Sequence, residues 1–177
     1  MTAHIFADES KRNSFVLAAS SIPEDQVAKM RQVVNSLRLP GQRRLHFVGE
    51  RDSRRLQIIR AFIEADVATA TTIYEASGIA DQKVARDAVI TRLTCDALRQ
   101  GAQMMVLELD DSLEAQDRWV IREQLRKSDR PDSLRYEHRR AHEECLLSIP
   151  DAIAWSWCKS SQWRKLVDPL VSEVIRL

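Results

Sequence analysis

Apolar residues along the chain recur with two different spacings, and each spacing predicts a different element. Two short apolar runs, HIFADES and FVLAAS, flank the polar stretch ESKRNS, which predicts an N-terminal β-hairpin. Elsewhere apolar residues recur every three or four positions, the spacing of a helix with one buried face. The segments predicted as helices in this way are 23–38, 50–65, 81–101 and 112–127. Two segments rich in apolar and β-branched residues, 66–77 and 102–112, are predicted as strands.

The last third of the chain mixes charged and apolar residues more closely. The segment 133–148 fits either a helix or an extended stretch followed by a helix. A helix over 150–161 is predicted to begin at Pro150, and the tail 162–177 is predicted to be helical at its end. Together these elements predict a mixed α/β sheet flanked by helices, and in such sheets ligands gather at the carboxyl ends of the strands.

The composition predicts a globular domain and argues against several classes of protein. With 177 residues, 44% of them hydrophobic and 30% charged, the chain suits a single domain over 1–177. The first residues lack the features of a signal peptide, and no stretch approaches the roughly 18 apolar residues of a membrane span. We therefore expect a cytoplasmic protein with no membrane partner. Because the net charge is only +1, any surface that binds nucleic acid must be a local one.

Two aspartates each follow an apolar strand. Asp8 ends the first strand, and Asp110 ends the strand predicted over 102–112. If the two strands are parallel neighbours, both carboxylates lie at one edge of the sheet and repel each other unless a divalent cation is bound. Mg²⁺ or Mn²⁺ suits such a pair, because it takes few protein carboxylates and leaves positions for substrate phosphate and water. The alternative is that both acids only favour turns.

Strand alternation separates each aspartate from its acidic neighbour. Glu9 should point to the opposite face of the sheet from Asp8. Asp111 should likewise point away from Asp110. Glu108 has the same parity as Asp110, so we expect it to lie deeper or to contact the site from behind.

At these motifs the sequence resembles a known family. FADES at the end of the first strand, LHF followed by acids, ELDDS at a middle strand and CLLSIPDAIAWS near the C-terminus resemble an uncharacterised bacterial family. That family has a ribonuclease H-like fold and an N-terminal Asp-Glu-Ser motif. The resemblance covers most of the chain in motif order, and it implies a single ribonuclease H-like α/β domain. Members usually have Gly after Asp-Glu-Ser where this chain has Lys11, and the late motif is interrupted here by Pro150.

The resemblance also implies a metal site that acts on nucleic acid, RNA or DNA. The carboxylates that it places at the first strand, an early helix, the central strand and the last helix are Asp8, Glu50, Asp110 and Asp151. It implies that they hold Mg²⁺ or Mn²⁺ for phosphodiester hydrolysis, with Glu9 and Ser10 in supporting positions. Two ions about 4 Å apart stabilise both the attacking and the leaving oxygen in such a reaction.

Asp151 has a structural alternative. In SIPD, Ser148 fits a helix N-cap, Pro150 the first turn and Asp151 an acidic position of a capping box. Capping could then be the whole role of this carboxylate. If both roles hold, a position at the helix start also aims Asp151 at the edge of the sheet.

Basic residues before the second helix are candidates for substrate contact. Arg43 and Arg44 closely precede His46, and we expect both arginines to contact phosphate. His46 could contact phosphate or act as acid or base, because the charge of histidine changes near neutral pH. The alternative for His46 is a packed or hydrogen-bonded structural residue.

Two other interpretations compete with a nuclease. The same fold could serve as a non-catalytic nucleic-acid-binding or protein-interaction module whose acids are turn and cap residues. Convergence of the carboxylates within metal-bridging reach would favour catalysis. The third interpretation is a zinc-binding structural domain, because His138, His142 and Cys145 recur at i, i+4 and i+7 of a predicted helix.

Overall fold

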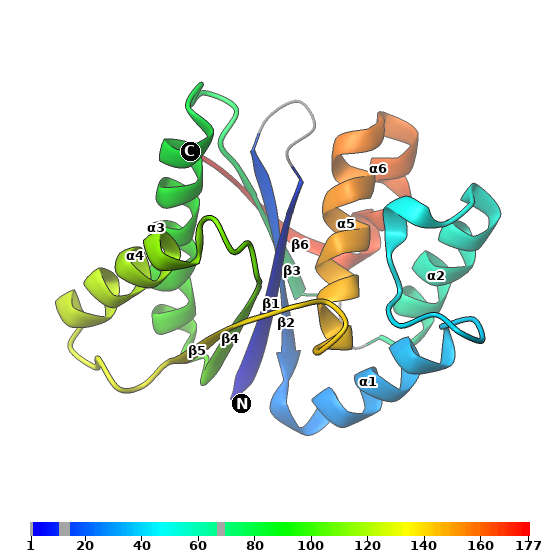
Figure 1. Ribbon diagram of the computed structural model, residues 1–177, viewed down its shortest axis with the longest axis horizontal. Coiled ribbons are helices and arrows are strands. Elements are labelled where there is room, and N and C mark those ends of the chain that lie inside the picture. The colour runs from blue at the N-terminus through cyan, green and yellow to red at the C-terminus, as the bar shows by residue number, and fades with distance from the viewer. Residues whose placement is uncertain (1, 11–14, 67–69) are drawn as a thin grey trace.

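A mixed sheet of six strands forms the centre of this computed structural model, which describes residues 2–10, 15–66 and 70–177 (Figure 1). The strands are β1 (Ala3–Ser10), β2 (Val16–Pro23), β3 (Ala70–Glu75), β4 (Met104–Glu108), β5 (Arg135–Arg139) and β6 (Val171–Arg176), in the spatial order β5-β4-β1-β2-β3-β6. β1 and β2 form the predicted antiparallel hairpin, whose turn at residues 11–14 lies outside the described residues. β4 pairs in parallel with β1, so the condition set for a site at the strand ends is met.

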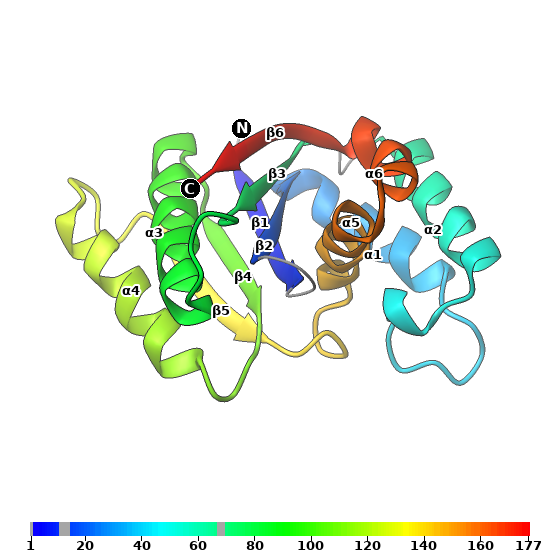
Figure 2. The same ribbon diagram turned by 90° about the horizontal axis from the view of Figure 1, so that it is seen from above.

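Helices cover both faces of this sheet. They are α1 (Val27–Ser36), α2 (Asp52–Glu64), α3 (Gln82–Gln100), α4 (Glu114–Lys127), α5 (Ser148–Lys159) and α6 (Ser161–Val167). α3 and α4 lie on one face, and α1, α2, α5 and α6 lie on the other (Figure 2). In the described part of the chain, no helix is both long and apolar enough to cross a membrane.

Strand alternation divides the buried side chains into two cores. On β1, Ile5 and Ala7 belong to the core under α3 and α4, whereas Phe6 belongs to the core under α5. β4 repeats this alternation with Leu107 and Val106. Both strands are therefore buried on both faces, and packing on each face fixes their register.

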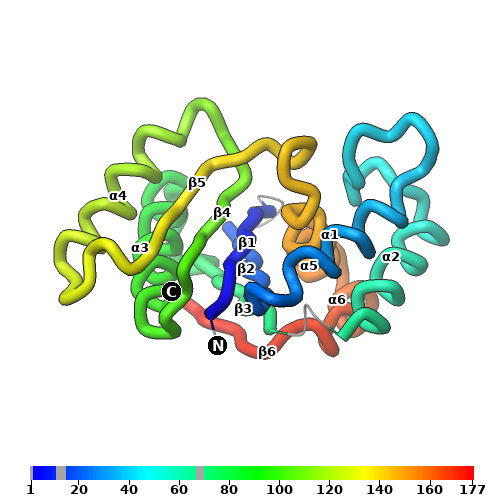
Figure 3. Tube along the Cα trace, turned by 90° about the horizontal axis from the view of Figure 1, so that it is seen from below, coloured from blue at the N-terminus to red at the C-terminus, as the bar shows by residue number. Residues whose placement is uncertain are grey.

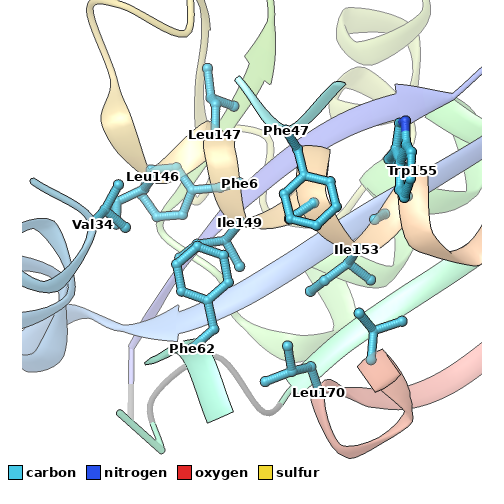
Figure 4. Close-up of a cluster of buried hydrophobic side chains, with 14 of the residues drawn as sticks. Phe6, Val34, Phe47, Phe62, Leu146, Leu147, Ile149, Ile153, Trp155 and Leu170 are labelled. Carbon is cyan, nitrogen blue, oxygen red and sulfur yellow. The ribbon is translucent and has the colours of Figure 1, made fainter. Parts of the chain in front are cut away.

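The core under α5 includes an aromatic cluster that anchors the loop between α1 and α2. Phe47 from this loop is 1% exposed, and its ring packs edge-on against Trp155 at 5.3 Å and Trp163 at 6.5 Å. Figure 4 shows Phe47 and Trp155 among the buried side chains contributed by α5 and its neighbours. Figure 3 shows the same loop beside α5, and the loop ends in a 3-10 turn at Phe47–Gly49 shortly before α2 begins at Asp52. The loop is therefore fixed by burial of an aromatic ring.

The helix predicted at the end of 162–177 is wrong. The chain leaves α6 through a 3-10 turn at Asp168–Leu170, where Pro169 cannot continue an α-helix. Val171–Arg176 then pairs in parallel with β3, although a bulge interrupts the register at its start. The strand is stabilised by pairing with β3, a long-range contact that local spacing does not encode.

The extended interpretation of 133–148 is confirmed for its first half. Arg135–Arg139 forms the edge strand β5, a short loop follows, and a 3-10 turn at Cys145–Leu147 leads into α5. The strand predicted over 66–77 is also confirmed in its described part, Ala70–Glu75, whereas residues 67–69 lie outside the described residues.

Removing the ring of Phe47 tests whether the loop depends on this packing. Phe47→Ala should lower the free energy of unfolding by about 3–5 kcal/mol, because it deletes a buried ring and leaves a cavity. Urea denaturation followed by circular dichroism measures this change. The adjacent Val48 is 47% exposed, so Val48→Ala is the control and should change stability by no more than about 0.5 kcal/mol. Equal small effects for both variants would show that the ring does not hold the loop.

Candidate functional site

Asp8 and Glu108 lie side by side on the sheet face that α5 covers. β1 and β4 pair in parallel, with Ala7 opposite Leu107. The next residues along the two strands, Asp8 and Glu108, are therefore in register at the carboxyl ends, and neighbouring strands are only about 4.8 Å apart. The carboxyl group of Glu108 is close enough to raise the pKa of Asp8. Two carboxyl groups this close do not both ionise readily unless nearby positive charge offsets their repulsion, and Arg44 supplies part of that charge beside Glu108.

Burial raises the pKa of Asp8 well above its ordinary value. Only 7% of the residue is exposed, and the hydrogen bond and charge of Glu108 raise the pKa further. The charge of Asp151 acts in the same direction, and the guanidinium of Arg44 opposes them. The backbone N–H of Glu9 donates to Oδ1 of Asp8 at 2.7 Å, which fixes the orientation of the carboxyl group. Strongly shifted carboxyls of this kind cluster at functional sites.

Asp151 approaches the pair from the first turn of α5. Its Oδ2 accepts a hydrogen bond from the backbone N–H of Phe47 at 3.1 Å. The same oxygen lies 3.7 Å from Nδ1 of His46, and the carboxylate is close enough to influence the pKa of Asp8. The loop between α1 and α2 thus fixes Asp151 beside the strand ends.

The capping box predicted for SIPD does not form. α5 begins at Ser148, and the N-cap position is occupied by Leu147, which makes no side-chain cap. The hydroxyl of Ser148 donates instead to the carbonyl of Cys145 at 2.7 Å. Because Asp151 bonds to Phe47 of another segment, helix capping does not explain this carboxylate.

Residues 44–47 alternate between the site and the core. Leu45 and Phe47 are buried, whereas Arg44 and His46 point outward from the core. Nη1 of Arg44 lies 3.4 Å from Oε1 of Glu108, so this arginine reaches the acid pair directly. His46 reaches Asp151 as described above. Arg43, the third predicted substrate contact, is exposed on the outer side of the same loop.

The two remaining predicted ligands contact other residues. Oε1 of Glu50 accepts from Nε2 of Gln42 at 2.9 Å. Oδ1 of Asp110 accepts from both the backbone N–H and the hydroxyl of Ser112, at 3.0 and 2.6 Å, in the turn that leads into α4. Among the residues that the structure describes, no group of three or more His, Cys, Asp or Glu side chains is arranged to hold a metal ion. The observed arrangement is an acid pair with a third acid nearby.

The donor chemistry of the pair nevertheless fits a divalent cation. Mg²⁺ is commonly held by one or two carboxylates, and the rest of its coordination comes from water and substrate phosphate. Asp8 and Glu108 supply such a pair, and a cation would relieve the repulsion that raises the pKa of Asp8. These two residues would hold the ion, and Asp151 is the nearest further carboxylate on this face.

A cavity of about 500 Å³ opens at the ends of β1 and β4. This volume lies within the range of ligand pockets, roughly 300–1,000 Å³. Its lining includes Asp8, Glu9, Glu108, Asp110 and Arg86. Asp110 therefore shares a cavity with the pair although its carboxylate is engaged in the turn.

Glu9 points to the opposite face from Asp8, as alternation predicts, and joins a buried ionic network there. It forms an ion pair with Arg86 of α3, and Arg86 also makes two hydrogen bonds of 2.7 Å to Asp117 of α4. Burial pushes the pKa of Asp117 upward, but hydrogen bonds from Arg86 and His138 leave it below the ordinary value. The network ties the end of β1 to both helices of that face. Ser10 is the last residue of β1, opposite Val16.

The zinc interpretation is wrong. His138 lies on strand β5, so it does not share a helical face with His142 and Cys145, which follow in the loop and the 3-10 turn. Nε2 of the buried His138 lies 3.2 Å from Oδ2 of Asp117, and His142 is exposed. The described residues contain no three-ligand group at this place either.

Glu108 was expected to lie deeper than Asp110 or to contact the site from behind, and the structure puts it in register with Asp8, two residues before Asp110. The sequence does hold a signal, because both strands carry an apolar run that ends at an acid, IFAD in β1 and VLE in β4. Aligning the two runs brings Asp8 level with Glu108, and Asp110 then lies two residues beyond the pair.

Comparison with known proteins identifies the fold. No family model matches the sequence, and no curated protein matches it significantly. Among solved structures, the chain resembles the RNase HII in the PCNA:RNase HII complex from Archaeoglobus fulgidus, with a TM-score of 0.52 over 86% of this chain and 70% of that chain. The two sequences are 16% identical, so the likeness concerns the fold alone. The protein has a ribonuclease H-like α/β fold, as its motifs predicted.

Replacing Asp8 by asparagine tests the state of the acid pair. Burial raises the folded-state pKa of Asp8 above its unfolded value, so ionisation costs stability as the pH rises from the unfolded pKa through the folded one. Asp8→Asn should therefore be more stable than wild type at neutral pH without divalent ions. The gain should be about 1.4 kcal/mol for each unit by which the folded pKa exceeds the unfolded one, and it should shrink as the pH falls toward the unfolded pKa.

Urea denaturation between pH 4 and pH 8 measures this difference. Asp132 is exposed in the loop after α4, so Asp132→Asn is the control and should change stability by less than about 0.5 kcal/mol. A loss of stability in Asp8→Asn that is constant with pH would contradict a shared proton.

Proposed function

We propose that the protein is a metal-dependent nuclease or phosphodiesterase that hydrolyses phosphodiester bonds in nucleic acid. The observation that carries this proposal is the adjacency of the buried Asp8 and the partly exposed Glu108 at the carboxyl ends of two parallel strands. Ligands bind at this edge in open α/β sheets, and a buried like-charged pair is stabilised when a cation joins it. The likeness in fold to an RNase HII is consistent with this reaction but does not fix it.

Mg²⁺ or Mn²⁺ is the cofactor that we propose for this pair. Bound divalent cations would supply an activated water for in-line attack and would offset charge on the leaving oxygen. Asp8 and Glu108 would bind the ions, and Asp151 would complete the site from α5. Glu50 and Asp110 remain predicted ligands. Each carboxylate accepts a hydrogen bond from a polar neighbour in this structure and would have to leave that neighbour to bind an ion.

Arg44 and His46 would act on the substrate phosphate. Arg44 is 3.4 Å from Glu108, so its guanidinium can exchange this carboxylate for a phosphate oxygen once a cation occupies the pair. His46 is 45% exposed on its side chain and stands beside Asp151, which can orient the imidazole. From this position it would donate a proton to the leaving oxygen as a general acid.

A non-catalytic nucleic-acid-binding or protein-interaction module is the second candidate. The observation that favours it is the ion pair between Arg44 and Glu108, which already gives one acid of the pair a cationic partner. In such a module Asp8 and Glu108 would have a structural role, and the protein would bind nucleic acid or another protein without cleaving it. The absence of a three-ligand metal group among the described residues fits this candidate as well.

Calorimetric titration of Mn²⁺ together with a nuclease assay separates the two candidates. Wild type should bind Mn²⁺, and the double variant Asp8→Asn, Glu108→Gln should lose this heat because both oxygen donors lose their charge. Cleavage of labelled single-stranded DNA, duplex DNA, RNA and RNA–DNA hybrid should fall by about 10²-fold or more in the variant. Asp111, exposed and paired with Arg140 at 2.9 Å, supplies the control Asp111→Asn, which should keep both properties.

Single variants then test whether Glu108 or Asp110, the two acids at the end of β4, binds the metal ion. Glu108→Gln should weaken Mn²⁺ binding and cleavage more than Asp110→Asn, because Glu108, and not Asp110, is in register with Asp8. The reverse order would move the metal site to Asp110. No Mn²⁺ binding and no cleavage by wild type, even with nucleic acid present, would favour the non-catalytic module.

A further inference from the structure

A short segment of the chain carries an excess of positive charge. Residues 38–60 contain seven arginines and two acidic residues, although the net charge of the whole chain is only +1. The segment runs from the end of α1 through the loop and along α2. The rest of the chain is therefore net acidic, and the positive charge is concentrated on the sheet face that carries the acid pair.

Two of these arginines hold the loop in place. Arg55 donates to the carbonyls of Phe47 and Val48 at 2.9 and 2.7 Å, and its guanidinium lies 4.3 Å from the ring centroid of Trp155. Arg54 donates to the carbonyl of Leu37 at the start of the loop. The side chains of Arg54 and Arg55 thus stabilise the fold.

Three others face solvent, and they define what we call the arginine loop: Arg38, Arg43 and Arg51, within residues 38–51. Arg38 donates to the carbonyl of Arg43 at 3.2 Å, so these two lie together. A hydrogen bond of 2.9 Å between Gln42 and Glu50, the residues that precede Arg43 and Arg51, ties the two ends of the loop together. Within the described residues, no carboxylate lies within ion-pair distance of any of the three guanidinium groups.

The arginines of α3 on the other face behave differently. Arg86 is held by Glu9 and Asp117, and Arg92 and Arg99 are both held by Asp96. Their charges are neutralised within the protein. The arginine loop therefore presents charge that the fold does not balance, and such charge suits an anionic partner.

The arginine loop is continuous with the acid pair. Arg44 and His46 of the same loop reach Glu108 and Asp151, and the three exposed arginines lie in the same segment, with Arg51 directly before α2. A strand whose phosphate lies at the acid pair would pass over the loop. Because the three exposed arginines are spread over residues 38–51, they suit repeated phosphates better than a single small anion.

We propose that the arginine loop binds the sugar–phosphate backbone of a nucleic-acid strand beside the acid pair, without needing a metal ion. This rests on the proposed function only in taking nucleic acid as the substrate. It specifies the substrate as a polynucleotide long enough to reach from the acids to the loop. Since phosphate contacts carry no sequence information, the loop adds affinity and position, and no sequence preference.

An anionic membrane surface is the rival partner, because Leu39 and Val48 of the loop are 48% and 47% exposed. Such a surface would explain the arginines and these apolar side chains, but it would not explain why the loop places Arg44 and His46 against carboxylates. The contacts of the loop with the acid pair thus favour nucleic acid.

Fluorescence anisotropy with a labelled single-stranded oligonucleotide of about 20 nucleotides in EDTA tests the proposal, since known single-strand sites span roughly 4–16 nucleotides. The double variant Arg43→Ala, Arg51→Ala should bind about tenfold more weakly than wild type. The slope of log K against log salt should lose about 0.7 for each phosphate contact removed, so about 1.4 for the pair. In the described part of the chain, neither arginine side chain makes a hydrogen bond or ion pair within the loop, and a thermal melt confirms that the variant folds.

Two further variants control for structure and for total charge. Arg43→Lys, Arg51→Lys should keep most of the affinity and the salt slope, because a point charge still contacts phosphate. Arg130 is exposed in the loop after α4 on the other face, and Arg130→Ala should bind as wild type does. Equal weakening by Arg130→Ala, or unchanged binding by the alanine pair, would overturn the proposal. So would weaker binding to phosphatidylserine vesicles with unchanged binding to the oligonucleotide.

The binding and cleavage outcomes are independent of each other. Loop-dependent binding in EDTA without any cleavage in Mn²⁺ would support the loop and count against the nuclease. Cleavage that depends on Asp8, together with oligonucleotide binding that the alanine pair does not weaken, would support the nuclease and contradict the proposed role of the arginine loop.

Discussion

Two carboxyl groups in register on neighbouring parallel strands impose the main constraint on this protein. Asp8 and Glu108 are adjacent because β1 and β4 pair with Ala7 opposite Leu107, and packing on both faces of the sheet fixes that register. Asp8 is buried and Glu108 lies beside it, so the charge of the pair is reduced when a proton is held on Asp8 or when a cation lies near, as Arg44 does beside Glu108. A protein gains nothing in stability from such a pair, which is the usual sign of a functional constraint.

The surrounding elements keep the two acids in place from both sides of the sheet. On the α5 side, the backbone of Phe47 fixes Asp151, and the buried ring of Phe47 in turn fixes the loop. On the other side, Glu9 is tied to Arg86 and so to the helices there. The consecutive residues Asp8 and Glu9 thus have opposite environments, one open to ligands and one neutralised within the core.

Much of the fold follows from local patterns in the sequence. The N-terminal hairpin and most helices are predicted by apolar spacing, whereas the parallel pairing of β1 with β4 was only a condition of the predicted site and is shown by the structure. The strands β5 and β6 were harder to predict, because each lies at an edge of the sheet and is stabilised by a distant partner. His138 was misplaced for the same reason, since it lies on the edge strand β5 and not on a helix with His142 and Cys145.

The candidate site shows the same limit at the scale of single residues. The type and approximate place of Asp8 and Asp151 could be predicted from short motifs, whereas the partner of Asp8 depends on strand register. A shift of two residues distinguishes Glu108 from Asp110, and periodicity alone cannot choose between residues of equal parity. The role of Asp151 likewise became clear only from its bond to Phe47, a residue 104 positions away.

The most direct measurement counts the protons released when Mn²⁺ binds. Calorimetry in buffers of different ionisation enthalpy gives this number, at a pH below the pKa that Asp8 shows without metal. If the ion displaces the proton shared by Asp8 and Glu108, about one proton should leave for each ion bound, and Asp8→Asn should release none. Binding without proton release in wild type, or an equal release from Asp8→Asn, would contradict a metal site at this pair.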